Sequence, residues 1–369
     1  MIKYNAVILI IIVFVACSSN ENNIQQVKFI DDSSLILLDS LIYENNDSSA
    51  FIGIMRDLEI VKNKIFISDR SKSKIHVFDD DLNYLKSFGL YGKGPHEFTQ
   101  APYLTKINDT LVVFDRSIKK LFYYNTNLEV VREITLPYKF FYMTHDPVII
   151  GDRIIMSANN KLVRKLNGNI SGLTTVLIID RQGRIIDQCA SLLDDYYKNS
   201  DLLYFALNSS SNISRGFDNS FFVLQLATYK IQQFDYYGKL MKIFEYKPKF
   251  YKTPPDVKAN FYISDIRKLY KVYYSRATYF YGLFFDPMTN LLLVGYRTLH
   301  ADEYQTKSFL DADNYLFILN KNGECILDAK IPGYVAAADN GIVYVVVEES
   351  DEKLVILKYK IEKKFETNS

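Results

Sequence analysis

The sequence predicts an all-β fold: a six-bladed β-propeller of four-stranded antiparallel blades, closed by an N-terminal strand and carrying one helical insertion near residues 255–273. Three observations predict it. A turn-centred hairpin pattern occurs six times, a second hairpin follows most copies, and strand-favouring aromatic residues are abundant, with 29 Tyr and 25 Phe in 369 residues. Hydrophobic residues make up 48% of the chain, which is enough apolar material for a large core.

The first residues of the chain have the features of an export signal. An unbroken apolar run over residues 6–15 is too short to span a membrane but fits the apolar region of a signal peptide. It leads into Ala16-Cys17-Ser18-Ser19, which resembles a bacterial lipobox whose cysteine carries lipid. We therefore expect a signal peptide over residues 1–16 and a lipidated tether over 17–23, with ordinary cleavage near Ala16 as the alternative.

The repeated unit is an apolar run, a short turn rich in Asn, Asp or Gly, and a second apolar run. These residue types tolerate the backbone conformations of tight hairpins. The turns centre on Asn63, Asp109, Asp152, Asp218, Asn290 and Asn340. In the second hairpins, the leading strand ends at Asp79, Asn125, Asp180, Asp235 or Asn320. Two hairpins in series make one four-stranded blade, so we expect blades near 52–88, 102–134, 146–189, 204–245, 279–329 and 332–361.

The ends of the chain predict how the ring closes. The sixth unit runs out of sequence before its fourth strand, whereas residues 26–42 contain surplus strand-like sequence before the first unit. Because unpaired sheet edges promote aggregation, the N-terminal segment is expected to complete the last blade. The propeller then covers residues 24–361, and residues 362–369 form a tail.

The stretch "FGLYGKGPHEF", residues 88–98, lies between the first two units. It is not a phosphate-binding loop, because Pro95 stands where such a loop would enter a helix. We interpret it as a structural linker in which Gly92 and Gly94 supply positive φ angles. The alternative is a ligand loop that uses Lys93, His96 and Glu97.

The lipobox, the "GxGPxEF" motif after the first blade and the Asp-ended strand pairs together resemble the six-bladed β-propeller lipoproteins of Gram-negative gut-type bacteria, often described as TolB-like or NHL-like. In this sequence, His96 stands where that family usually has a second Gly. The resemblance implies the fold and an outer-membrane lipoprotein that faces the periplasm or the cell surface. It implies no established reaction and no catalytic residues.

A segment between the fourth and fifth units interrupts the strand pattern. Thr253, followed by two prolines and Asp256, has the character of a helix start, and apolar residues then follow at helical spacing up to residue 273. The expected helix is rich in basic residues, among them Lys258, Arg267, Lys268 and Lys271. These could form a docking face for an acidic glycan or protein, or simply a solvated helix face.

The two cysteines beyond the leader, Cys189 and Cys325, fall in separate predicted strands and are expected to be buried free thiols. With the four histidines they supply no clustered zinc ligands. No sequence motif of a metalloprotease or serine hydrolase occurs. The formal net charge of +1 argues against a broad nucleic-acid-binding surface.

The sequence therefore favours a lipid-anchored binding or scaffold module of the cell envelope, with a protein or glycan partner and no cofactor. The alternative is a metal-dependent enzyme of the lactonase or lyase type, with a divalent cation in the central tunnel. The candidate tunnel residues near the inner strands are Asp57, Glu59, Asp146, Arg215, Asp286 and Asp339. Carboxylates are also common at hairpin turns for purely structural reasons.

Overall fold

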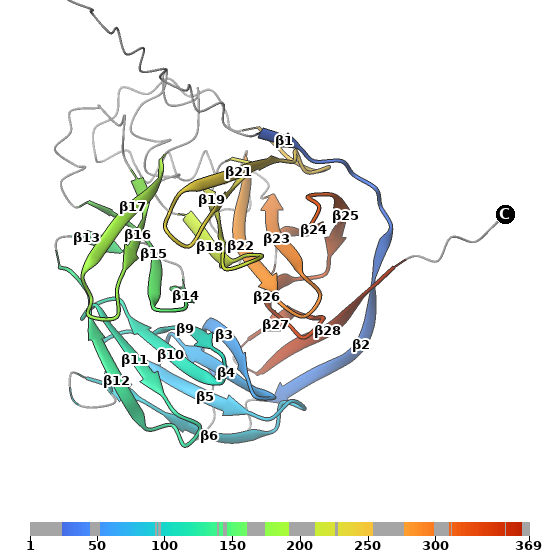
Figure 1. The fold of residues 1–369 in the computed structure, drawn as a ribbon. Helices are drawn as coiled ribbons and strands as arrows, with labels where there is room; N and C mark the ends of the chain where they lie inside the picture. Colours follow the sequence, from blue (N-terminus) through green and yellow to red (C-terminus); the bar gives the residue numbers. More distant parts are fainter. Residues whose placement is uncertain are drawn as a thin grey trace, which may run out of the picture.

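The computed structural model describes residues 24–44, 52–92, 94, 97–138, 140–142, 146–160, 174–191, 211–225, 228–253, 277–298, 310, 312–350 and 352–363. Six antiparallel sheets stand side by side around a central axis and close into a ring (Figure 1). The secondary-structure elements named within these ranges, β1 to β28, are all strands, which confirms the predicted propeller. None of the described residues forms a helix that is long and apolar enough to cross a membrane.

Each of the first three blades begins at the axis and runs outward through successive hairpins. Blade 1 consists of β3 (Met55–Val61), β4 (Lys64–Asp69), β5 (Lys74–Phe78) and β6 (Tyr84–Phe88). Blade 2 consists of β9 (Tyr103–Ile107), β10 (Thr110–Asp115), β11 (Lys120–Tyr124) and β12 (Val130–Thr135). Blade 3 consists of β14 (Val148–Ile150), β15 (Arg153–Asn160), β16 (Thr174–Ile179) and β17 (Ile185–Ser191), with β13 (Phe140–Tyr142) also paired to β15.

The last three blades follow the same order from axis to rim. Blade 4 consists of β18 (Ser211–Arg215), β19 (Phe221–Gln225), β20 (Lys230–Phe234) and β21 (Leu240–Glu245). Blade 5 consists of β22 (Thr278–Asp286), β23 (Leu291–Thr298), β24 (Asp313–Asn320) and β25 (Cys325–Ile331). Blade 6 consists of β26 (Tyr334–Asp339), β27 (Ile342–Glu349), β28 (Lys353–Lys363) and the N-terminal β2 (Ser33–Glu44).

The outer hairpins share one local hydrogen-bond pattern, which explains the recurring Asp or Asn. In blade 4, one carboxylate oxygen of Asp235 accepts hydrogen bonds from the Tyr237 and Lys239 backbone N–H groups, both at 2.9 Å. Asp79, Asn125, Asp180 and Asn320 make the corresponding pair of bonds in their own blades. The side chain thus fixes the turn, as is typical of Asx turns, and the turn sets the strand register.

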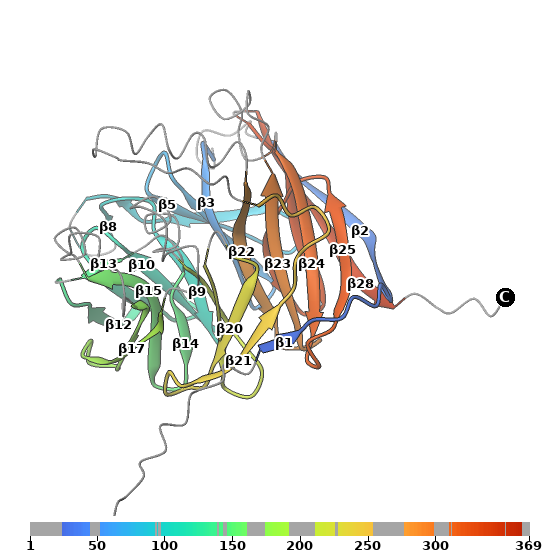
Figure 2. The same ribbon diagram turned by 90° about the horizontal axis from the view of Figure 1, so that it is seen from above.

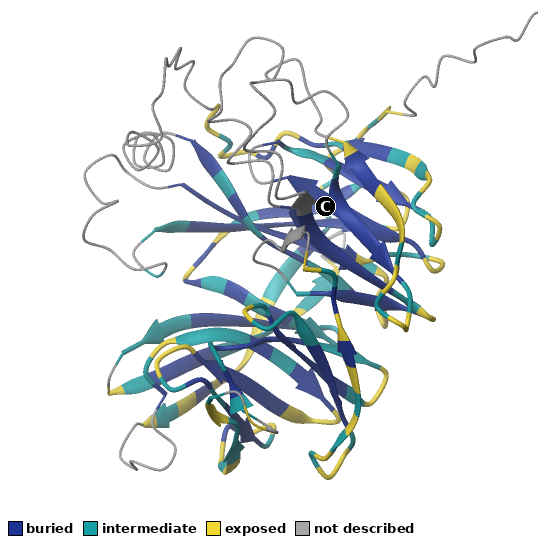
Figure 3. Ribbon diagram, turned by 90° about the vertical axis from the view of Figure 1, so that its left-hand side faces the viewer, coloured by how far each residue is buried: buried dark blue, intermediate teal, exposed yellow. Residues whose placement is uncertain are grey.

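Hydrophobic packing lies mainly between neighbouring blades. Six separate clusters of buried side chains fill the six junctions between adjacent sheets. Figure 3 shows buried residues along the strands and exposed residues concentrated at the turns. His76 is fully buried in the first blade, with its Nε2 atom 3.6 Å from the Asp69 carboxylate. Cys189 and Cys325 are buried free thiols, as predicted.

The N-terminal segment closes the ring as predicted. β2 pairs with β28 from Ser33 opposite Lys363 to Glu44 opposite Lys353, and so supplies the outermost strand of blade 6. Before reaching it, the chain follows the outside of two other blades. β1 (Ile24–Gln26) pairs in parallel with β21 of blade 4, and Phe29 bridges to Cys325 of blade 5. The segment is visible as the outer blue ribbon of Figure 1.

The loop after blade 1 corrects one expectation. Neither Gly92 nor Gly94 has a positive φ; Gly89 does, at 83°. β7 (Leu90–Tyr91) pairs in parallel with β8 (Glu97–Phe98), and this pairing rather than a left-handed turn shapes the loop. Lys93 and His96 lie outside the described residues.

We expect Gly89→Val to lower the stability of the fold by about 1–3 kcal/mol, because a β-branched residue is strained at this φ. A Cβ atom at Gly89 would also lie 2.4 Å from the ring of the fully buried Phe98. Gly94→Val should cost less, since the three atoms nearest to its Cβ would all belong to the flexible Glu97 side chain, at 3.0–3.3 Å. Urea unfolding of both variants measures the difference. Equal losses would contradict this assignment of roles.

Candidate functional site

One end of the propeller axis holds a cavity with a volume of ≈ 570 Å³. Each blade begins with its innermost strand, so the starts of β3, β9, β14, β18, β22 and β26 gather around the axis (Figure 1). Five blades contribute to the lining, from Met55 in blade 1 to Tyr334 in blade 6, and Asp146 contributes from immediately before blade 3. A volume of about 300–1,000 Å³ is typical of small-molecule sites, so this cavity can hold a ligand of disaccharide size.

Aromatic side chains form much of the cavity wall. They are Tyr103, Tyr279, Tyr281, Phe284 and Tyr334. The rings of Tyr281 and Tyr334 meet edge to face with centroids 6.4 Å apart. Burial raises the pKa of both hydroxyl groups, so they stay neutral. The wall therefore offers ring faces together with neutral hydroxyl groups.

Contacts behind the cavity hold two of these rings in place. The Tyr281 hydroxyl oxygen accepts a hydrogen bond from the Val335 backbone N–H at 3.1 Å. Gly295 leaves the space that this ring occupies, since a Cβ there would lie 2.5 Å from it. The Arg297 guanidinium lies 4.9 Å from the centre of the Tyr279 ring. The aromatic wall is thus supported by its neighbouring strands.

Arginines contribute positive charge to the same cavity. Arg56 stacks over the Tyr103 ring at 4.5 Å and donates a hydrogen bond to the Tyr103 hydroxyl. Burial lowers the pKa of Arg56, but a guanidinium stays charged at any physiological pH. Arg70 lines the cavity as well. Guanidinium groups donate several hydrogen bonds, so this side of the cavity suits oxygen acceptors on a ligand.

Two carboxyl groups meet in the cavity, Asp57 from blade 1 and Asp146 immediately before blade 3. Asp57 accepts hydrogen bonds from the backbone N–H groups of Leu104 at 2.6 Å and Leu58 at 2.9 Å. Burial and the neighbouring Asp146 raise the pKa of Asp57 well above its ordinary value. Burial also raises the pKa of Asp146 to about 6. Because two adjacent buried carboxyls resist double ionisation, the pair holds one proton near neutral pH.

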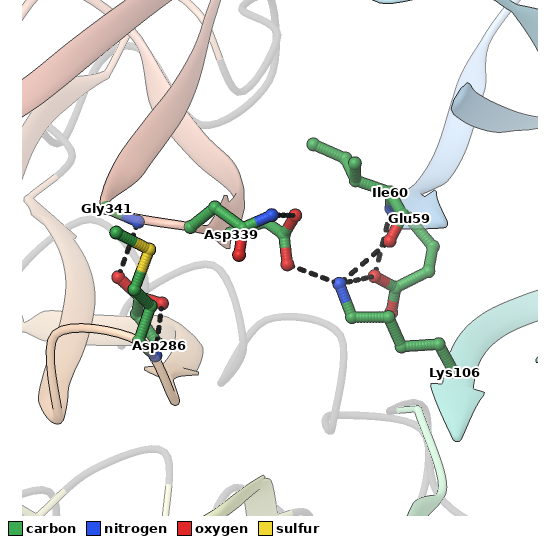
Figure 4. A network of polar contacts seen from close by, with 8 residues as sticks. Glu59, Ile60, Lys106, Asp286, Asp339 and Gly341 are labelled. Atoms are coloured by element: carbon green, nitrogen blue, oxygen red, sulfur yellow. Dashed lines mark hydrogen bonds and ion pairs between the residues drawn. The ribbon is translucent and has the colours of Figure 1, made fainter. Parts of the chain in front are cut away.

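Below the cavity, the side chain of Lys106 links three blades (Figure 4). Its Nζ lies 2.5 Å from the Asp339 carboxylate, 2.8 Å from the Ile60 carbonyl oxygen and 3.5 Å from the Glu59 carboxylate. Burial opposes the charge on Lys106, but the two carboxylates outweigh it and raise the pKa of the lysine. Burial raises the pKa of Glu59 to about 7, although Lys106 opposes this shift. The cluster is an internal ion network across the axis.

The structure thus brings together four of the six predicted tunnel residues, in two pairs. Asp57 and Asp146 line the cavity, and Glu59 and Asp339 bind Lys106. Asp286 instead accepts hydrogen bonds from Thr289 Oγ1 and the Gly341 N–H, both at 2.7 Å, and ties a blade 5 turn to blade 6. Arg215 is exposed at the end of β18.

The other predicted sites do not extend this cavity. Glu97 accepts a hydrogen bond from the Gly94 N–H at 2.6 Å within its own loop. The helix expected near residues 255–273, with Lys258, Arg267, Lys268 and Lys271, lies outside the described residues, as do the leader and Cys17. Among the described residues, no three His, Cys, Asp or Glu side chains stand close enough together to hold a metal ion.

Several residues of the cavity and of the ion network below it escaped the sequence analysis, namely Arg56, Arg70, Tyr103, Tyr279, Tyr281, Tyr334 and Glu349 in the cavity and Lys106 in the network. A usable signal was present: most of them belong to the first strand of a blade. Once the sequence is divided into blades, polar and aromatic residues in those strands become candidates for the axis. The remaining two, Arg70 and Glu349, follow or end a second strand and gave no such signal.

Comparison with known proteins supports the fold. Residues 17–150 match the DUF5128 family, a 6-bladed beta-propeller. No curated protein sequence matches the chain. A structure of a DUF4221 family member from Bacteroides vulgatus is similar at a TM-score of 0.62 and 12% identity, covering 90% of this chain and 99% of that one.

A second structure, of a Bacteroides fragilis protein described as exported, is similar at a TM-score of 0.56 and 13% identity. That likeness covers 92% of this chain and 100% of the other. At such identities the shared property is the propeller fold.

Proposed function

We propose that this protein is a lipid-anchored binding protein of the cell envelope that holds a small, hydroxyl-rich ligand such as a disaccharide in the cavity at the end of its axis. The observation that carries the proposal is the composition of the cavity wall. Tyrosine faces can stack on sugar rings, the carboxyl pair can accept and donate hydrogen bonds, and the arginines donate to hydroxyl or carboxylate oxygens.

The cellular address rests on the leader and on Cys17. The described fold is also shared with a protein described as exported. A lipid anchor at the outer membrane would present the cavity to glycans of the periplasm or the cell surface. A protein partner would then dock on a surface of the propeller away from this cavity.

Binding can be tested with a panel of neutral, amino and acidic disaccharides by titration calorimetry. We expect one class to bind, and Tyr281→Ala to weaken that binding by about tenfold or more, since truncating a buried aromatic hot-spot residue typically costs about 2 kcal/mol or more. Tyr237→Ala is the matched control, because Tyr237 is 66% exposed in a blade 4 turn. Equal weakening by both variants, or no binding by any disaccharide, would refute the proposal.

A second candidate is an enzyme that uses the Asp57–Asp146 pair for general acid and base chemistry. The observation that favours it is that two buried carboxyls from separate parts of the chain meet in the cavity wall. Burial raises the pKa of Asp146 to about 6, and an acid that titrates near the working pH transfers protons efficiently. The described residues supply this pair rather than a ligand set for the divalent cation considered from the sequence. Release of cleavage products from the bound disaccharide, lost in Asp146→Asn, would separate an enzyme from a binding protein.

Lipid attachment gives an independent prediction. Cells that express the full chain with labelled fatty acid should incorporate label into the protein, and Cys17→Ser should abolish incorporation. The variant should also accumulate in an uncleaved form if lipid addition precedes cleavage. Label that persists in Cys17→Ser would show that the lipid is attached to another residue and would contradict an anchor at Cys17.

A further inference from the structure

Exposed apolar side chains are concentrated along the N-terminal segment. Between residues 24 and 42, six large apolar side chains are 42–57% exposed: Ile24, Phe29, Ile36, Leu37, Leu38 and Ile42. This segment forms the outer rim of blades 4, 5 and 6 in succession, as the blue ribbon of Figure 2 shows for β1 and β2. Scattered exposed apolar residues are ordinary, but a run of them on one rim indicates a contact surface.

The edge of β2 does not suit pairing with a strand of another protein. Within the described residues, β2 pairs with β28 alone and leaves its second edge without a partner strand. A register shift between Leu37 and Asp39 places a β-bulge in the middle of that edge. Bulges interrupt the regular ladder that strand addition requires. A fluid lipid surface needs no such register.

We infer that the rim formed by residues 24–42 is a lipid-contacting surface, which lays the propeller edge-on against the membrane that holds Cys17. The inference rests on the proposed lipid anchor. The tether of residues 17–23 can span at most about 25 Å, so the rim begins close to the membrane surface. An edge-on position keeps both ends of the propeller axis, and with them the cavity, away from the membrane surface.

Charges along this strand pair are mixed rather than uniformly basic. Ile36 lies opposite Lys360, which pairs with Glu362 at 2.9 Å, and Glu44 lies opposite Lys353. Apolar contact rather than attraction to anionic lipid should therefore dominate binding. Such contact is only weakly sensitive to salt.

The absence of tryptophan from the sequence makes a direct test possible. Leu37→Trp places a single fluorescent reporter on the rim, where Leu37 is 54% exposed. Val131→Trp is the matched control, because Val131 is 61% exposed on β12, the outer strand of blade 2 across the ring. Both are made in the chain from residue 17 onward with Cys17→Ser, which keeps every described residue and carries no lipid.

With vesicles of phosphatidylethanolamine and phosphatidylglycerol, emission from Leu37→Trp should shift to shorter wavelength and be quenched by brominated phospholipids, also in about 0.5 M salt. Emission from Val131→Trp should not change. Adding Ile36→Asp and Leu38→Asp to Leu37→Trp should weaken vesicle binding by about tenfold or more, because carboxylates resist leaving water. Thermal unfolding of this variant should match that of Leu37→Trp alone.

Two results would overturn the inference. One is no response of Leu37→Trp to vesicles. The other is the same spectral shift without vesicles as protein concentration rises, which would assign the rim to a second copy of the chain. If Leu37→Trp responds but the full chain takes up no lipid at Cys17, the proposed anchor fails while the lipid-contacting rim stands.

Discussion

A chain that lacks residues 24–44 is expected to lose several kcal/mol of stability and to aggregate, because blade 6 then lacks its outermost strand. The deletion exposes the edge of β28 along its pairing with β2. It also removes Leu41, which is 3% exposed in the hydrophobic cluster between blades 6 and 1. Urea unfolding and light scattering of the purified chain measure both effects.

A point substitution makes the same test without removing backbone. Leu41→Ala should destabilise the protein by about 2–5 kcal/mol, as is usual for leucines in packed cores. Leu38→Ala, on the same strand but 51% exposed, should change stability by about 0.5 kcal/mol or less. If Leu41→Ala unfolds at the same urea concentration as the unchanged chain, β2 does not carry the closure of the ring.

Asp146→Asn is expected to stabilise the protein at pH 8 by up to about 3 kcal/mol, because each pKa unit corresponds to about 1.4 kcal/mol. In the folded state the pKa of Asp146 is about 6, raised by burial from 3.8. The folded state therefore binds the proton more tightly than the unfolded state. The stability that this proton confers is complete below about pH 4 and is lost as pH rises through 6.

Other carboxyls contribute to the pH dependence against which this change is measured, among them Asp57 and Glu349, whose pKa values burial also raises. The pKa of Glu59 is raised to about 7, so its contribution to the stability of the fold is likewise lost as pH rises from about 4.5 to 7. Burial opposes ionisation of Asp69, but hydrogen bonds from the Ser71 N–H and hydroxyl, together with the contact to His76 at 3.6 Å, outweigh it and lower the pKa of Asp69 to about 2. The contribution of Asp69 to stability is therefore lost only on acidification.

The thermal unfolding temperature should therefore fall less steeply between pH 4 and pH 8 for Asp146→Asn than for the unchanged chain. Asp109→Asn is the control, because Asp109 makes only a surface ion pair with Lys62 and is 66% exposed. Parallel curves for Asp146→Asn and the unchanged chain would contradict a carboxyl pair that shares one proton in the cavity.

The sequence by itself determined the number of blades, their turns and their closure. These features depend on local chemistry. Asp235 fixes its hairpin through bonds to residues two and four positions later, and Asn340 adopts the positive φ that its turn requires, at 52°. Closure of the ring followed from counting strands, since the last blade lacks one strand and the N-terminal segment has one to supply, so that pairing the two completes the last blade.

Only the tertiary structure decided the site. Asp57 and Asp146 come from different blades, and nothing near either residue in the sequence marks it as the partner of the other. The partners of Lys106 could not be assigned from the sequence for the same reason, because its two carboxylates lie in blades 1 and 6. Even Gly89 could not be separated from Gly92 by sequence, since the position of Phe98 decides which glycine is needed. Local hydrogen bonds determine turns, whereas burial and proximity across the axis determine charge, and these exist only once the ring has closed.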